Sequence, residues 1–161
     1  MAWMSNWQYA NDVPTRQFRS VNSLPRELSL YEDVHGHLRV GVRPVKEAEH
    51  LGQRVTLRPK AGKPAVLEIS NPAGEFVTPV YDPLPCTLTF NRSQSGETAF
   101  SNHFSDEVIM PIFPRKGDSM KSLSLDIFID NCSIEVFDAE GRFCLTNLIF
   151  PSKKMTQYKN L

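Results

Sequence analysis

The sequence has few cysteines and no long hydrophobic run, and both absences exclude common protein classes. Its three cysteines are Cys86, Cys132 and Cys144, with no Cys-x-x-Cys spacing. An odd, unpaired set argues against a disulfide framework or a zinc site and predicts buried free thiols. No apolar run approaches the roughly 20 residues of a membrane-spanning helix. Residues 1–7 lack the basic and apolar regions of a signal peptide, so none is expected in this chain.

An excess of charge of either sign is also missing. The 161 residues include 18 Lys and Arg and 18 Asp and Glu, so the formal net charge is zero. Nucleic acids and anionic membranes are bound through clustered positive charge, so neither is an expected partner. Hydrophobic residues make up 40% of the chain, which argues against disorder. The length suits one domain, or one domain with part of a second.

Sequence patterns that carry catalysis or bind cofactors are scarce. There is no Gly-x-Ser-x-Gly sequence and no Gly-rich phosphate loop, and no cofactor is expected. The pair in His35-Gly36-His37 falls on a predicted turn without a third ligand, which indicates a solvated turn and no metal site. The acidic pairs Asp106-Glu107 and Asp138-Ala139-Glu140 are also interpreted as turn residues, because glycosidase carboxylates come from separate parts of a chain.

Short alternating segments between turns fill most of the sequence. Apolar residues alternate with polar ones over 123–129, and 132–137 and 143–150 follow after turns at 130–131 and 138–141, which predicts an antiparallel meander. Only 45–52 has a helical pattern. This arrangement predicts an all-β sandwich or barrel. The other expected strands are 28–31 pairing with 38–42, then 65–69, 76–81, 86–90 closed by a turn at 91–96, and 107–112, which Pro111 confines to an edge.

The first 26 residues differ from the rest. Between Trp3 and Arg26 the sequence is rich in Trp, Asn, Pro and Arg and has no clean periodicity. This composition is more typical of a site or an interface than of a core.

A family resemblance rests on this N-terminal segment. The run Trp3-Met4-Ser5-Asn6-Trp7-Gln8-Tyr9-Ala10, then Val13-Pro14-Thr15 and Leu24-Pro25-Arg26-Glu27-Leu28, resembles glycoside hydrolase family 32, which contains levanases, inulinases and invertases. In that family such a run belongs to the last blade of a five-bladed β-propeller. Further matches, at 91–96, 130–137 and 149–151, resemble the C-terminal β-sandwich of the family.

The resemblance implies two domains and a chain that begins within a propeller strand. We expect residues 1–45 to be a remnant of the final blade, 46–54 a linker, and 55–161 the sandwich. The remnant would expose edges and apolar faces that other blades cover. Three outcomes are open for it: it is mobile, it folds back on the sandwich, or it drives self-association.

The catalytic motifs of the family are not matched. Asn11-Asp12 is followed by Val13 where the nucleophile motif has Pro, and Asp82-Pro83 is preceded by Tyr81 where the stabiliser motif has Arg. No Glu precedes a Cys, as the acid/base motif requires. Retaining hydrolysis needs a nucleophile and an acid/base about 5–5.5 Å apart. We therefore expect no catalytic residue in this chain and no activity of the chain alone.

The resemblance assigns one substrate-binding residue. By position, Trp3 corresponds to the Trp that packs against the fructosyl ring, a role expected only in the complete parent enzyme. Asn6 and Trp7 are expected to pack or cap within the blade. Arg26 and Glu27 are expected to form a charged brace between strand and linker.

We expect the first of three functions, and the other two stay open as alternatives. The first is structural support of the catalytic propeller in a β-fructosidase that acts on fructan or sucrose. The second is an ancillary fructan-binding module, which needs exposed aromatic rings, and the third is an oligomerisation domain. For the location of the parent enzyme, periplasmic and extracellular are both open. The candidate aromatic residues for the second function are Phe76, Tyr81, Phe100, Phe104 and Phe113.

Overall fold

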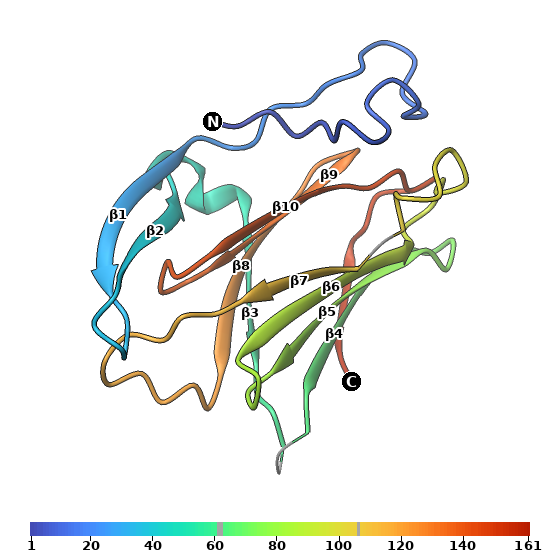
Figure 1. The fold of residues 1–161 in the computed structure, drawn as a ribbon. Coiled ribbons are helices and arrows are strands. Elements are labelled where there is room, and N and C mark those ends of the chain that lie inside the picture. Colours follow the sequence, from blue (N-terminus) through green and yellow to red (C-terminus); the bar gives the residue numbers. More distant parts are fainter. Residues whose placement is uncertain (61–62, 106) are drawn as a thin grey trace.

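Short β-strands form almost all the regular structure. The computed structural model describes residues 1–60, 63–105 and 107–161 (Figure 1). Within these residues the single helical element is η1, a 3-10 helix over Lys46–Leu51, inside the range expected to be helical. The all-β prediction is therefore confirmed. The strands are β1 (Arg26–Glu32), β2 (Leu38–Pro44), β3 (Gln53–Leu57), β4 (Ala65–Ser70), β5 (Phe76–Asp82), β6 (Thr87–Gln94), β7 (Val108–Pro111), β8 (Leu123–Ile129), β9 (Ser133–Asp138), β10 (Cys144–Leu148) and β11 (Gln157–Asn160).

Two antiparallel sheets pack face to face as the predicted β-sandwich. One sheet has the order β10-β9-β8-β3 and the other β11-β4-β5-β6-β7. Along β4, Ala65, Leu67 and Ile69 are buried and the residues between them are half-buried, because successive side chains of a strand point to opposite faces. The core between the sheets is completed by buried residues that include Val77, Leu88, Phe90, Leu123, Leu125, Ile127, Ile134, Val136 and Leu145.

The predicted meander is β8, β9 and β10. Each strand pairs antiparallel with the next. Val136 of the central strand β9 lies opposite Ile127 of β8 and opposite Leu145 of β10. Gly141 lies in the second turn at φ 77°, a conformation that glycine adopts without strain. The last strand ends at Leu148, two residues before the predicted end.

The second sheet differs in part from the prediction. β7 lies at its edge, as Pro111 predicted. However, β6 continues to Gln94 through the predicted turn at 91–96. The reason is that Arg92 points inward and is buried, so a charged side chain occupies a core-facing position of the strand. Two strands were not predicted at all, β3 and β11.

The predicted pairing of 28–31 with 38–42 is confirmed by the hairpin of β1 and β2. Asp33 closes its turn by accepting hydrogen bonds from the backbone N–H groups of His35 and His37. The hairpin turns one apolar row to solvent, a surface that we call the hairpin row. Its members, all more than half exposed, are Leu28, Leu30, Leu38 and Val40.

The N-terminal segment lies along the end of the sandwich near β9 and β10 (Figure 1). It is packed against the sandwich, because Tyr9 and Val13 are buried in a cluster with Phe104 and Leu148. Of the three outcomes left open by the sequence, the structure therefore has the segment folded back on the sandwich.

Candidate functional site

Near its start, the N-terminal segment pairs with itself through an isolated β-bridge. Trp3 forms an antiparallel bridge with Asn22, and the Met4 N–H donates to the Val21 carbonyl at 2.9 Å. The pairing holds Trp3 beside Trp7, with 5.5 Å between ring centroids and 79° between ring planes. The two indoles thus form an edge-to-face pair at the start of the chain.

Both indoles face solvent. Trp3 is 49% exposed and Trp7 is 86% exposed. Trp7 was expected to pack or cap within the blade; in this structure its ring contacts Trp3 and is otherwise exposed. Asn6 does cap the local turn, since its Oδ1 accepts a hydrogen bond from the Gln8 N–H at 2.9 Å.

A second group of aromatic rings fastens the segment to the sandwich. Tyr9 is buried, with its ring edge to face with Phe104 at 5.5 Å and with Phe100 at 5.8 Å. Phe150, just beyond β10, packs against both phenylalanines. Such ring pairs contribute about 0.5–1.5 kcal/mol each beyond their buried area.

Arg92 links this aromatic cluster to the sheets. Its Nη2 donates to the Tyr9 hydroxyl at 3.2 Å and its Nη1 donates to the Leu148 carbonyl at 2.9 Å. The guanidinium also lies over the Phe104 ring, 4.2 Å from the centroid. A single side chain of β6 therefore contacts the N-terminal segment, the end of β10 and Phe104, which lies between β6 and β7.

Among the described residues, the predicted charged brace is present for Arg26 and not for Glu27. Arg26 Nη2 lies 2.8 Å from Glu135 Oε2, and both side chains are mostly buried. The Glu135 carboxylate also accepts the Leu24 N–H at 2.7 Å. Glu27 is exposed, so the brace joins Arg26 to the interior of β9 and is no surface pair.

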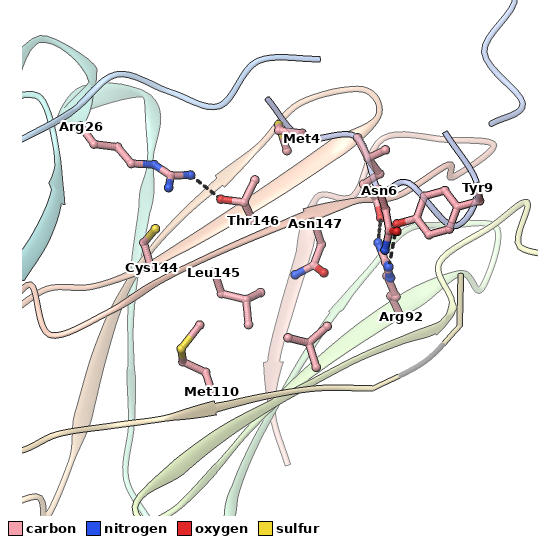
Figure 2. Close-up of a pocket in the computed structure, with 12 residues that line it drawn as sticks. Met4, Asn6, Tyr9, Arg26, Arg92, Met110, Cys144, Leu145, Thr146 and Asn147 are labelled. Atoms are coloured by element: carbon pink, nitrogen blue, oxygen red, sulfur yellow. Dashed lines mark hydrogen bonds between the residues drawn. The ribbon is translucent and has the colours of Figure 1, made fainter. Parts of the chain in front are cut away.

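A cavity of about 380 Å³ lies between these two fastening points (Figure 2). The N-terminal segment covers one side of it with Met4, Asn6 and Tyr9. Residues of β10 line the other side, and β6 and β7 add Arg92, Val108 and Met110. The cavity is therefore at the open edge of the sandwich, where β10 and β7 end their respective sheets.

The aromatic residues considered for fructan binding do not form an exposed platform. Tyr81 and Phe104 have no exposed surface, which contradicts their candidacy. Burial raises the pKa of Tyr81 to about 12, and its hydroxyl donates to the Met120 carbonyl at 2.7 Å. Phe113 is covered by the Arg39 guanidinium at 3.8 Å, and Phe100 packs in the aromatic cluster. Phe76, at the start of β5, is half-buried.

The histidines of the sequence analysis lie in a turn, whereas Asp138, which was expected to be a turn residue, is the last residue of strand β9. His35 and His37 are in the hairpin turn, with ring centroids 6.2 Å apart. Burial alone would raise the pKa of Asp33, but hydrogen bonds from the His37 N–H, the Arg39 guanidinium and the His35 N–H hold it well below its usual range. Asp138 is buried and binds Arg142. Of the pair at 106–107, Asp106 lies outside the described residues.

The described part of the chain contains no group of three His, Cys, Asp or Glu side chains that a metal ion would need. Cys86, Cys132 and Cys144 are free thiols, as predicted, although each is only partly buried, and burial raises the pKa of each. Across residues 1–60, 63–105 and 107–161, no helix has the length and apolar character to cross a membrane.

The comparisons with known proteins agree with the resemblance. Residues 32–160 match the family model described as glycosyl hydrolases family 32 C terminal, and residues 1–40 match that of the glycosyl hydrolases family 32 N-terminal domain. A levanase of Bacillus subtilis (strain 168) is 33% identical over 95% of this chain and 26% of the levanase. An extracellular exo-inulinase of Aspergillus niger is 28% identical over 94% of this chain and 33% of that protein. The chain thus spans about a quarter to a third of the length of these relatives.

Solved structures share the fold. The crystal structure of an exo-inulinase from Aspergillus awamori superposes with a TM-score of 0.82 and 22% identity, over 98% of this chain and 36% of that one. A β-fructofuranosidase from Schwanniomyces occidentalis gives a TM-score of 0.73 and 20% identity, over 99% of this chain and 40% of that one. Taken with the two family models, these matches show that the chain belongs to glycoside hydrolase family 32 and carries the C-terminal β-sandwich of that family.

Proposed function

We propose that this chain is the supporting part of a β-fructosidase, in which the sandwich holds the catalytic N-terminal domain and supplies no catalytic residue. The relatives are named levanase and exo-inulinase, which makes a fructan the proposed substrate of the whole enzyme. The domain boundary is proposed to lie in residues 46–54, with residues 1–45 belonging to the N-terminal domain and 55–161 to the sandwich. Most of the range 46–54 is occupied by η1.

The observation that carries the proposal is the contrast between the two faces of the hairpin of β1 and β2. On the inner face, Tyr31 is buried and its hydroxyl donates to the Phe113 carbonyl at 3.0 Å. On the outer face, Leu28 and Leu30 are 71% and 70% exposed. An apolar row of this kind is typical of a surface that another protein element covers. Since residues 1–40 match the N-terminal domain model, further strands of that domain are the proposed cover.

The fastening of the N-terminal segment supports the same function. The Arg26–Glu135 ion pair and the Tyr9–Arg92 hydrogen bond both join residues 1–40 to the sandwich strands. Contacts of this kind fix the orientation of one domain on the other. The sandwich would therefore act as a rigid base for the domain above it.

Trp3 is proposed to contact a fructosyl ring in the whole enzyme. An exposed indole provides the flat apolar face that packs on the apolar face of a sugar. In this structure the Trp3 ring is half exposed and is held in place by the Asn22 bridge and the Trp7 ring. Its position is compatible with that role, which depends on walls supplied by the rest of the N-terminal domain.

Two measurements on the purified chain separate support from its alternatives. Calorimetric titration with levan and inulin oligosaccharides is expected to give no saturable heat. Saturable binding would favour the ancillary fructan-binding function. Light scattering over a range of concentrations tests the oligomerisation function, which predicts a defined dimer or larger assembly. A monomer that does not bind fructan is the result expected of a supporting module.

A further inference from the structure

The cavity between the N-terminal segment and β10 has an unusual charge. Two arginines, Arg26 and Arg92, line it, and none of its lining residues is acidic. The charge of Arg26 is balanced by Glu135 at 2.8 Å. Arg92 has no carboxylate within ion-pair distance among the described residues, although only 5% of its surface is exposed. A buried guanidinium without a counter-charge is unfavourable, because the charge has lost its hydration and gained no ionic partner.

Three buried hydrogen-bond donors, on residues that line the cavity, have no acceptor among the described residues. They are the Nε atoms of Arg26 and Arg92 and the Nδ2 of Asn147, all buried within the protein. Asn147 is only 5% exposed. Figure 2 shows its side-chain amide between Arg26 on one side and Arg92 on the other. All three of these groups are donors, so a ligand that pairs with them would have to supply acceptors.

The fold explains why these donors meet. In β10, Leu145 and Asn147 point to the interior of the sandwich, and in β6 Phe90 and Arg92 do the same. Leu145 and Phe90 fill the core, whereas Asn147 and Arg92 occupy the next inward positions toward the end that Tyr9 covers. Arg92 and Asn147 thus occupy inward positions at which apolar side chains would extend the core. Packing of the core does not explain why these two residues are polar.

We propose that this cavity binds a small anion that carries a carboxylate or phosphate group. The anion would balance the charge of Arg92 and accept from the Asn147 amide, since charge-assisted hydrogen bonds to guanidinium are the strong ones. The volume of about 380 Å³ falls in the range of small-molecule sites and admits an acid or a sugar phosphate. A neutral sugar would supply acceptors but leave the charge unbalanced.

Nuclear magnetic resonance of the full chain tests the proposal directly. Inorganic phosphate, acetate and neutral fructose are titrated separately at constant ionic strength, and the side-chain amide of Asn147 and the Nε–H of Arg92 are followed. Saturable shifts of these signals are expected with phosphate or acetate. Phosphate alone would identify a phosphate ligand and acetate alone a carboxylate. No shift with either anion, or the same shift with fructose, overturns the proposal.

Variants provide the second test. Asn147→Leu removes the donor at similar volume and is expected to weaken anion binding at least tenfold. Asn147→Asp adds a negative charge next to Arg92 and is expected to abolish binding. The matched control is Arg54→Gln, which removes an exposed arginine paired with Asp126 and leaves the cavity unchanged. Unaltered anion affinity in both Asn147 variants, or equal loss in the control, would show that the anion binds elsewhere on the surface.

Discussion

Arg26 and Glu135 are 109 positions apart in the chain, and their side chains meet at 2.8 Å between Nη2 and Oε2. Arg26 begins β1, at the point where the N-terminal segment enters the hairpin, and Glu135 lies in the middle of β9. The same carboxylate accepts the Leu24 N–H. One buried acid of the sandwich therefore fixes both the entry and the first strand of the hairpin.

Glu135→Gln is expected to destabilise the protein by about 3 kcal/mol, because it leaves a mostly buried arginine without its counter-charge. Urea unfolding monitored by tryptophan fluorescence measures the change. The control is Asp126→Asn, which breaks the exposed pair with Arg54 and is expected to cost less than about 1 kcal/mol. Equal effects of the two substitutions would contradict the role given to Glu135.

Tyr9→Phe is expected to cost about 1 kcal/mol, the usual contribution of one hydrogen bond, because the ring stays in its aromatic cluster while the bond to Arg92 is lost. Tyr9→Ala is expected to cost about 3–5 kcal/mol and to release the N-terminal segment. Hydrogen exchange measures the second effect through the Met4 and Ser23 amides, which are bonded across the segment. Undiminished protection of these amides in Tyr9→Ala would show that the aromatic cluster does not hold the segment.

Asp33→Asn is expected to destabilise the hairpin turn in a pH-dependent way. The pKa of Asp33 is lower in the folded protein than its ordinary value of 3.8, so its stabilising contribution is fully present above that value. The contribution declines as the pH falls below 3.8 toward the folded-state pKa. Unfolding free energies of both proteins between about pH 7 and pH 2 are expected to differ most at neutral pH and to converge in acid. A difference that grows in acid would contradict this.

Substitutions in the hairpin row are expected to leave the fold intact. Leu30→Lys and Leu38→Lys change exposed side chains, so each should alter the free energy of unfolding by no more than about 0.5 kcal/mol. Both are expected to reduce any concentration-dependent self-association in light scattering, because they add charge to the apolar row. Lys substitutions that unfold the chain would mean that the row is part of its own core.

The sequence predicted those strands in which apolar residues alternate regularly. β8 is an example, since Leu123, Leu125 and Ile127 follow period two and all are buried. β11 was missed because its four residues are all exposed and show no alternation. The predicted strand stopped before Arg92 because the polar run at 91–96 is typical of a turn. Arg92 nevertheless occupies a core position of β6, where its two Nη atoms donate to the Leu148 carbonyl and the Tyr9 hydroxyl.

The candidate site was harder to predict, because it depends on contacts between distant residues. Trp3 was predicted from a motif and stays a prediction; the structure leaves its ring half exposed. The Tyr9–Arg92 bond joins residues 83 positions apart, and no local pattern indicates it. The unmatched donor of Asn147 depends on which face of β10 is inward and on what covers it, which only the packed structure shows.

Fructose release by the purified chain tests the central claim most directly. Levan, inulin and sucrose are incubated with the chain at high protein concentration, and free fructose is compared with a blank without protein. A supporting sandwich that supplies no nucleophile and no acid/base is expected to release no fructose above the blank. Turnover at rates typical of an enzyme, about 1 s⁻¹ or more, would contradict the claim and place a catalytic site within these 161 residues.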